Sequence, residues 1–253
     1  MCKLKPLILF LILIVTLGCA NKKNVLYLQD INNEKVYNLS YELYKLKTDD
    51  ILKISISIDD KEILESLVNS EYNQNETRES LIFKGYQVNS DGYINFDQLG
   101  DIYVADKTID EVRENIKTLI ISSGLYNNPM VKVKLLNANF TVLGEVKNPG
   151  YYNFQKNNLN ILEAIGMAGD LTINGVREEI KVIRYNKGKQ NVFTLDLTSS
   201  NILVNNSFQI FSGDIIIVNP NTSRIKNAGI IGNSGTLITL LSFILSSIIV
   251  INN

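Results

Sequence analysis

The 253-residue sequence contains no histidine, no tryptophan and only two cysteines. Without histidine, the chain has no Ser-His-Asp or Cys-His catalytic group, and a zinc or iron site would lack its commonest ligand. The 25 basic and 26 acidic residues leave a net charge of −1, so the chain has no strong positive field to hold a nucleic acid. We therefore identify no catalytic, cofactor-binding or metal-ligating residues from the composition and expect no nucleic-acid partner.

Residues 1–18 have the pattern of a signal peptide. Two lysines precede an apolar run from Leu7 to Val15, which is too short to cross a bilayer. The segment Thr16-Leu17-Gly18-Cys19 resembles a bacterial lipobox, with Thr16 where leucine is usual. We therefore predict lipid attachment at Cys19; an ordinary secretory signal with a chance cysteine is the alternative. No aspartate follows Cys19 to resemble an inner-membrane retention signal, which favours an outer-membrane anchor with the body in the periplasm.

Charge is absent from the other end of the chain. No charged residue occurs between Asn227 and Asn253. Positions 237–251 form an apolar run, about 22 Å long as a helix. On a helical wheel one side of this run carries hydroxyl groups, from Thr236, Thr239, Ser242, Ser246 and Ser247. We predict a C-terminal transmembrane helix over residues 223–253 with this stripe facing a pore. A buried core helix or a simple tail anchor are the alternatives.

Between the ends, residues 44–136 combine strand and helix patterns. Ile54 and Ile56 alternate with serines, as in a half-buried strand. Thr108 and Glu111 predict a capping box that opens a helix, and Gly124 is expected to end it. The alternating residues after Pro129 predict another strand.

Other patterns in this half of the chain give weaker expectations. Residues 25–31 predict a strand, and the polar residues 69–80 predict a loop. Asp59 is expected to cap a short helix. Residues 85–96 predict two strands that pair around an Asp91-Gly92 turn.

Residues 137–222 predict one helix folded onto a small mixed sheet, a β-grasp pattern. A Pro149-Gly150 turn separates two strands. Asn160 and Glu163 bracket the start of a helix, and three further strands follow it. The segments Asp49-Asp50-Ile51-Leu52 and Gly213-Asp214-Ile215-Ile216 are alike, and each is predicted to be a turn that leads into a strand.

The predicted fold class is α+β, with an export domain of short strands and helices, a β-grasp-like domain and a C-terminal membrane helix. The predicted divisions of the chain are a signal peptide (1–18), an N-terminal anchor and linker (19–43), the export domain (44–136), the β-grasp domain (137–222) and the C-terminal transmembrane helix (223–253).

The order of these segments resembles the outer-membrane polysaccharide export lipoproteins. The first module resembles their export domain through Tyr44, Leu46, Asp50, Leu52, Ile54, Val88, Asp91, Gly92, Ile94, Gly100, Thr108, Glu111, Asn128, Pro129, Val131 and Val133. The second resembles their soluble-ligand-binding β-grasp domain through residues 143–146 and 148–150, Ala164, Ala168, Gly169, Gly213 and Asp214. The chain departs from the family at Asp49 and Asp170, where glycine is usual, and at Asp97, where proline is common. Aspartate tolerates some turn geometries that favour glycine.

The resemblance implies a non-enzymatic channel subunit for capsule or exopolysaccharide. Its implied partners are the polysaccharide, outer-membrane lipid (palmitate on the anchor), further copies in an octamer-like homo-oligomeric ring, and an inner-membrane co-polymerase or tyrosine-kinase-type protein. A ring can place every hydroxyl stripe inward, which a single helix cannot do.

Two other functions are compatible with the residues. A lipoprotein that binds glycan or an envelope partner without forming a pore would be a monomer. A glycan hydrolase would need two carboxylates facing one cleft. The pairs Asp49/Asp50 and Asp59/Asp60 are adjacent only in sequence, and turn formation and capping account for them.

Overall fold

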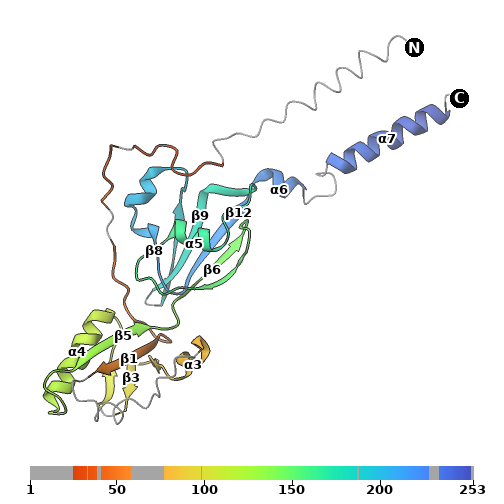
Figure 1. The fold of residues 1–253 in the computed structure, drawn as a ribbon. Helices are drawn as coiled ribbons and strands as arrows, with labels where there is room; N and C mark the ends of the chain where they lie inside the picture. The colour runs from red at the N-terminus through yellow and green to blue at the C-terminus, as the bar shows by residue number, and fades with distance from the viewer. Residues whose placement is uncertain are drawn as a thin grey trace.

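The computed structural model describes residues 25–32, 34–38, 41–57, 77–97, 99–186, 188–227 and 234–251. These residues form two compact modules, one below the other in Figure 1, and the C-terminal helices follow beyond the second module. Each module has its own cluster of buried apolar side chains. The mixture of helices and strands confirms the α+β class.

The first module contains a three-stranded antiparallel sheet in the order β2-β1-β5, a separate β3–β4 hairpin and the helix α4. Its elements are β1 (Ile51–Ser57), α3 (Arg78–Phe83), β2 (Tyr86–Gln87), β3 (Tyr93–Phe96), β4 (Gly100–Tyr103), α4 (Ile109–Ser122) and β5 (Met130–Leu135). The predicted alternation places Ile54 and Ile56 of β1 in the core, because successive side chains of a strand point to opposite faces.

Helix α4 begins and ends where the sequence predicts. The Thr108 hydroxyl accepts a hydrogen bond from the Glu111 backbone nitrogen at 3.2 Å, and the Thr108 backbone nitrogen donates to the Glu111 carboxylate at 2.7 Å. After the helix, Gly124 adopts a φ of +73°, which a glycine reaches at no steric cost. The capping box is therefore confirmed. Val112, Ile116 and Ile120 of this helix are buried.

Two expectations for the first module are wrong. The strands on either side of the Asp91-Gly92 turn do not pair with each other: β2 pairs with β1, and β3 pairs with β4. The Asn89 side chain accepts from the backbone nitrogens of Asp91 and Tyr93, so it closes the turn locally, while each flanking strand pairs with another strand. The end of the predicted 69–80 loop contains the start of α3, which Thr77 caps. The helix expected after Asp59 lies outside the described residues.

The second module is built on a five-stranded mixed sheet in the order β10-β9-β12-β6-β7, in which β12 is parallel to β6. A two-stranded β8–β11 sheet and the helix α5 complete it. Its elements are β6 (Asn139–Gly144), β7 (Gly150–Asn153), β8 (Leu159–Asn160), α5 (Ile161–Met167), β9 (Gly175–Asn186), β10 (Lys189–Leu195), the 3₁₀ helices η2 (Ser200–Val204) and η3 (Asn206–Phe208), β11 (Gln209–Ile210) and β12 (Asp214–Pro220). A Cβ on Gly144 would stand 2.0 Å from the Val218 carbonyl oxygen, so this glycine permits the parallel pair.

Helix α5 has the predicted reciprocal cap. The Asn160 side chain accepts from the Glu163 backbone nitrogen at 2.9 Å, and the Asn160 backbone nitrogen donates to the Glu163 carboxylate at 3.1 Å. This cap confirms the helix start and turns Ile161, Ala164 and Ile165 into the core.

Residues 25–31 do not form the predicted strand. Instead, residues 25–30 pack against the second module as an irregular segment, which we call the N-terminal strap. Leu28 donates a backbone hydrogen bond to the Leu197 carbonyl at 3.0 Å, and Gln29 donates to the Thr198 carbonyl at 2.7 Å. Leu28 has a φ of 45°, so the strap cannot continue as an extended edge strand.

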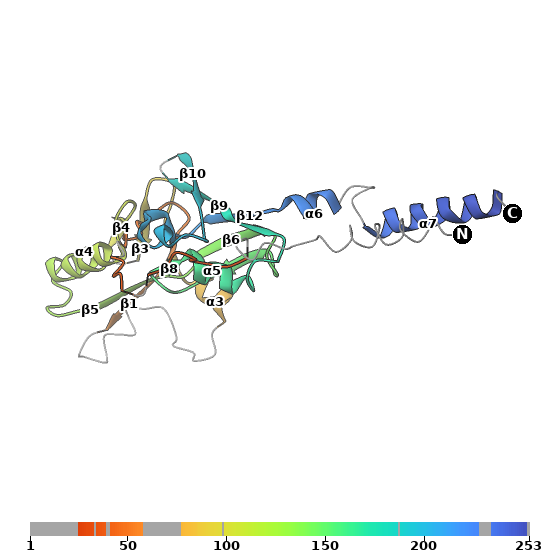
Figure 2. The ribbon, with the colours of Figure 1, turned by 90° about the horizontal axis from the view of Figure 1, so that it is seen from above.

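Two helices, α6 (Thr222–Asn227) and α7 (Ser234–Ile251), follow β12. Helix α7 contains the predicted apolar run and projects beyond α6 in both views (Figures 1 and 2). Among the residues that the structure describes, no helix is both long enough and apolar enough to cross a membrane. The transmembrane helix expected over residues 223–253 is therefore not supported.

Candidate functional site at the module junction

Two similar turns lead into the central strands of the two modules. Before β1, the Asp50 carboxylate accepts from the Lys47 backbone nitrogen at 2.9 Å. Before β12, the Asp214 carboxylate accepts from the Phe211 backbone nitrogen at 2.8 Å. Both aspartates are buried, at 3% and 1% exposure. The structure therefore confirms the predicted likeness of these two segments.

The residue before each buried aspartate has a left-handed backbone. Asp49 has a φ of 70° and Gly213 a φ of 86°. A left-handed residue reverses the chain in one step, which lets the next side chain reach back to the nitrogen three residues earlier. Position 49 thus holds an aspartate where the geometry favours glycine.

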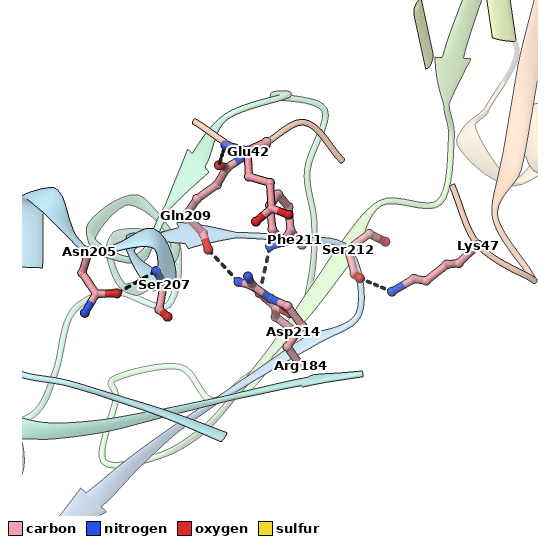
Figure 3. A network of polar contacts seen from close by, with 9 residues as sticks. All are labelled: Glu42, Lys47, Arg184, Asn205, Ser207, Gln209, Phe211, Ser212 and Asp214. Atoms are coloured by element: carbon pink, nitrogen blue, oxygen red, sulfur yellow. Dashed lines mark hydrogen bonds and ion pairs between the residues drawn. The ribbon is translucent and has the colours of Figure 1, made fainter. Parts of the chain in front are cut away.

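The two turns face each other across the junction. The Lys47 ammonium group donates a hydrogen bond of 2.6 Å to the Ser212 carbonyl oxygen, 165 residues away (Figure 3). A Cβ on Gly213 would lie 3.1 Å from the Lys47 Nζ atom, so the missing side chain gives the lysine room. The Tyr44 and Phe211 rings also meet, with centroids 6.1 Å apart. Each module therefore supports the other's strand-initiating turn.

The first carboxylate, that of Asp50, is buried and hydrogen-bonded. The Tyr44 hydroxyl donates to both Asp50 oxygens, at 3.0 and 2.9 Å. Burial raises the pKa of Asp50 to about 6, although the hydrogen bonds from Lys47 and Tyr44 oppose the rise. Burial and the nearby carboxylate raise the pKa of Tyr44 far above its usual range, so its hydroxyl stays a donor.

The second carboxylate forms a nearly enclosed ion pair. Arg184 of β9 donates from Nε to Asp214 Oδ1 at 3.0 Å and from Nη2 to Oδ2 at 2.8 Å, a two-point contact. The same Nη2 donates to the Gln209 carbonyl at 2.7 Å. The guanidinium also lies 4.3 Å from the centroid of the Phe211 ring. Figure 3 shows Arg184 and Asp214 directly beneath Phe211.

Two side-chain amides complete the junction. The Gln209 side chain accepts from the Glu42 backbone nitrogen and donates to the Glu42 carbonyl, both at 2.9 Å. Asn137, between the modules, accepts from the Ile51 backbone nitrogen at 2.9 Å and donates to the Asp49 carbonyl at 2.8 Å. The segment at Glu42, which leads into the first module, is therefore bonded to the second module. Asn137, which leads from the first module into the second, is bonded to the first.

The N-terminal strap is anchored by side chains as well as backbone. The Asp30 carboxylate accepts from the Ser199 hydroxyl at 3.0 Å and from the Ser200 backbone nitrogen. The Tyr27 hydroxyl donates to Asp170, and Arg177 lies 5.3 Å from the Tyr27 ring centroid. The strap therefore belongs structurally to the second module.

The residues predicted for the pore lie on α7. Thr239, Ser242 and Ser246 are exposed, and Ser247 is half-buried. Their hydroxyls donate to backbone carbonyls of the same helix three or four residues earlier, at 2.8 to 3.0 Å. Each hydroxyl therefore donates its hydrogen bond within the helix, and its oxygen atom is left mainly as an acceptor for other groups.

Several residues with predicted roles lie outside the part of the chain that the structure describes. The Thr236 side chain and the predicted lipid attachment residue Cys19 lie outside the described residues, as do Asp59 and Asp60. Asp50 is buried and held by the turn, while Asp49 is exposed beside it, so this pair does not face a common cleft. Within the described ranges, no cluster of three His, Cys, Asp or Glu residues could hold a metal.

Sequence reasoning missed most of the junction. It singled out Tyr44, Asp50 and Asp214, but it gave no role to Lys47 or Arg184. A lysine and an arginine in separate modules carry no local pattern that pairs them with a distant carbonyl or carboxylate. The likeness of the two Asp-containing turns was the available signal.

Comparison with known proteins places each module in a family. Residues 40–136 match the family described as polysaccharide biosynthesis/export protein, and residues 139–194 match the SLBB domain. The EPS I polysaccharide export outer membrane protein EpsA of Ralstonia solanacearum is 32% identical over 140 residues, which are 54% of this chain and 36% of that protein. The protein of the same name from Ralstonia nicotianae is 35% identical over 107 residues, 41% of this chain and 28% of that protein. The chain spans about a third of the length of these curated relatives.

Proposed function

Because the chain belongs to the polysaccharide export protein family, we propose that it is a non-enzymatic subunit of an outer-membrane conduit for capsule or exopolysaccharide. The observation that carries this proposal is the pair of matched domains in consecutive order, joined by a closed polar junction. Both Ralstonia relatives are named as polysaccharide export outer membrane proteins.

The junction suits a subunit that has to hold a fixed shape. A ring closes only if every copy has the same geometry, because small angular errors accumulate around it. The Lys47–Ser212 and Gln209–Glu42 contacts restrict rotation of one module against the other. We therefore extend the proposal to a homo-oligomeric, octamer-like ring of such subunits, working with an inner-membrane co-polymerase or tyrosine-kinase-type partner.

The ends of the chain have separate roles in the proposal. Cys19 is the lipid attachment site that holds the protein at the outer membrane, with the two modules in the periplasm. In the assembled ring, the hydroxyl side of α7 faces inward. Its side chains are neutral and offer acceptor oxygens, so a hydrated glycan can exchange hydrogen bonds along the wall without being trapped by charge.

The first test compares the full-length chain with a variant that ends at Lys226. The mass of each would be measured after extraction in detergent, and polymer export would be assayed in cells that carry each form. The proposal expects a large discrete assembly for the full-length chain. It expects the truncated chain, still held by the lipid on Cys19, to fail to form that assembly and to leave polymer unexported.

The alternative outcome is equally definite. A monomeric full-length protein would overturn the ring and leave a lipoprotein that binds glycan or an envelope partner without a pore. A C19S variant tests the anchor separately, because loss of the lipid should move the protein out of the outer-membrane fraction without changing the fold of the modules.

A further inference from the structure

A polar cavity lies in the second module, away from the junction. Its volume is about 260 Å³, and it opens between the end of β10 and the two 3₁₀ helices that follow. It is lined by Thr194, Leu195, Asp196, Ser199, Asn201, Ile202 and Asn205. Six of these seven residues lie beyond the end of the SLBB match at residue 194.

The size of the cavity limits what can enter it. Pockets for drug-sized ligands have volumes of about 300–1,000 Å³, and this one is slightly smaller. Leu195 and Ile202 of the lining are almost fully buried, so the groups open to a ligand are mainly hydroxyl, amide and carboxylate. A small site with such hydrogen-bonding groups is complementary to the hydroxyls of a single sugar ring.

Several polar groups in the cavity are not used by the protein. Within the described residues, the Thr194 hydroxyl and the Asn201 side-chain amide have no hydrogen-bond partner. The Asn205 side-chain oxygen accepts from the Ser207 backbone nitrogen at 2.8 Å, which leaves the amide hydrogens of this lining residue available to a ligand. One Asp196 carboxylate oxygen accepts from both the backbone nitrogen and the hydroxyl of Thr198. The other carboxylate oxygen is available to accept from a ligand. The site thus offers two amide groups, a hydroxyl and one carboxylate oxygen.

The negative charge of the lining favours uncharged sugars over acidic ones. Asp196 is the one ionisable residue in the lining, and Asp30 of the strap is bonded to the neighbouring Ser199. No lysine or arginine lines the cavity. A uronic acid would bring its carboxylate next to these two negative groups, which costs free energy.

The rim of the cavity is held in place before any ligand arrives. Ser199 donates to Asp30 at 3.0 Å and accepts from the Asn201 backbone nitrogen at 3.3 Å. These contacts attach the start of η2 to the N-terminal strap. A fixed rim lowers the entropy cost of ordering side chains on binding.

We propose that this cavity binds one uncharged sugar residue of a glycan chain. The inference rests on the proposed function, since an export protein meets glycan at its surface. Asn201 and Asn205 form hydrogen bonds with ring hydroxyls, and the free Asp196 oxygen accepts from another. A contact of about twelve non-hydrogen atoms in an open site gives millimolar affinity, weak enough for the polymer to move on.

Saturation-transfer difference NMR tests this on the full-length chain, in a detergent without a sugar headgroup. The probes are methyl β-D-glucopyranoside and the methyl glycoside of glucuronic acid. The glucoside should give saturation transfer and the glucuronide should give several-fold less. The variants T194A and N201A remove groups that the fold does not use, and each should reduce the glucoside signal at least threefold. N191A, an exposed asparagine on the same strand outside the lining, should leave it unchanged.

Each result decides the proposal. No transfer from the glucoside, equal transfer from the glucuronide, or an unchanged signal in both T194A and N201A would overturn it. Circular dichroism of the variants distinguishes a lost contact from a lost fold. If the glucoside does not bind while the chain still assembles and exports polymer, the cavity assignment fails and the conduit stands. If the glucoside binds to a monomer that exports nothing, the conduit fails and the cavity assignment stands.

Discussion

Lys47 and Ser212 are 165 residues apart in the chain, and the ammonium group of one donates to the carbonyl oxygen of the other across 2.6 Å. Replacing Lys47 with methionine keeps most of the aliphatic stem and removes the donor. We expect a loss of about 1–2 kcal/mol in the free energy of unfolding, because a partly buried carbonyl loses a charged partner. Urea unfolding followed by circular dichroism measures it.

Lys132, exposed on β5, gives the matched control. The same substitution there should change the free energy of unfolding by less than about 0.5 kcal/mol. If K47M and K132M unfold at the same urea concentration, the junction contact does not contribute to stability.

The Arg184–Asp214 pair should be far more sensitive. R184M leaves the Asp214 carboxylate buried and without its cation, which costs about 3 kcal/mol. The double variant R184M/D214N should recover part of this loss, because no buried charge is then left alone. A double-mutant cycle in urea would give a coupling energy above about 1 kcal/mol. Additive effects of the two changes would contradict the direct pairing.

The raised pKa of Asp50 predicts how stability depends on pH. The folded state binds the Asp50 proton up to about pH 6, whereas an unfolded aspartate releases it near its ordinary pKa of about 3.9. Between these values the folded state holds more protons, so this group's stabilising contribution is complete at low pH and is lost as the pH rises through 6.

The variant D50N removes this titration and keeps a side chain that can bond Tyr44 and the Lys47 nitrogen. The Tm difference between D50N and the natural chain should therefore change between pH 4 and 7, with D50N gaining relative stability as the pH rises. A difference that stays constant across this range would show that Asp50 does not titrate there.

Asp49 and Asp170 provide a paired test of backbone strain. Both have left-handed φ values, 70° and 77°, in the region that favours glycine. D49G loses only an exposed 3.1 Å hydrogen bond from the Gln87 amide, so it should stabilise the protein by about 0.5 kcal/mol, since the relief of strain exceeds this loss and the extra entropy of an unfolded glycine. D170G relieves the same strain but loses the Tyr27 contact and a 2.7 Å bond to the Leu171 nitrogen, so it should destabilise by about 1 kcal/mol. Thermal unfolding of both variants would distinguish them; a gain in both would mean that the Tyr27 contact contributes little.

Sequence patterns predicted best where the cause was local. Both capping boxes, at Thr108 and Asn160, depend on two side chains three residues apart, and both are present. The aspartates at positions 49 and 170 departed from the expected glycine, and the structure gives both the backbone conformation that glycine favours.

The failures arose where distant segments compete for the same residues. The Asp91-Gly92 turn favours a hairpin between β2 and β3, but β2 pairs with β1 and β3 pairs with β4. The apolar residues within 25–31 favour a strand, yet this segment forms backbone hydrogen bonds to the Leu197 and Thr198 carbonyls of the second module and stays irregular. No local pattern shows which partner wins.

The N-terminal strap also determines which module would bear a mechanical force applied to the N-terminal end of the described chain. A pull on residue 25, away from the body, would first stress the Leu28–Leu197 and Gln29–Thr198 bonds and the Asp30 contacts. All of these belong to the second module, so the sheet around β1 would feel no tension until the strap detached. A membrane anchor upstream of residue 25 would thus tether the protein by its second module, and the first module would be free of traction.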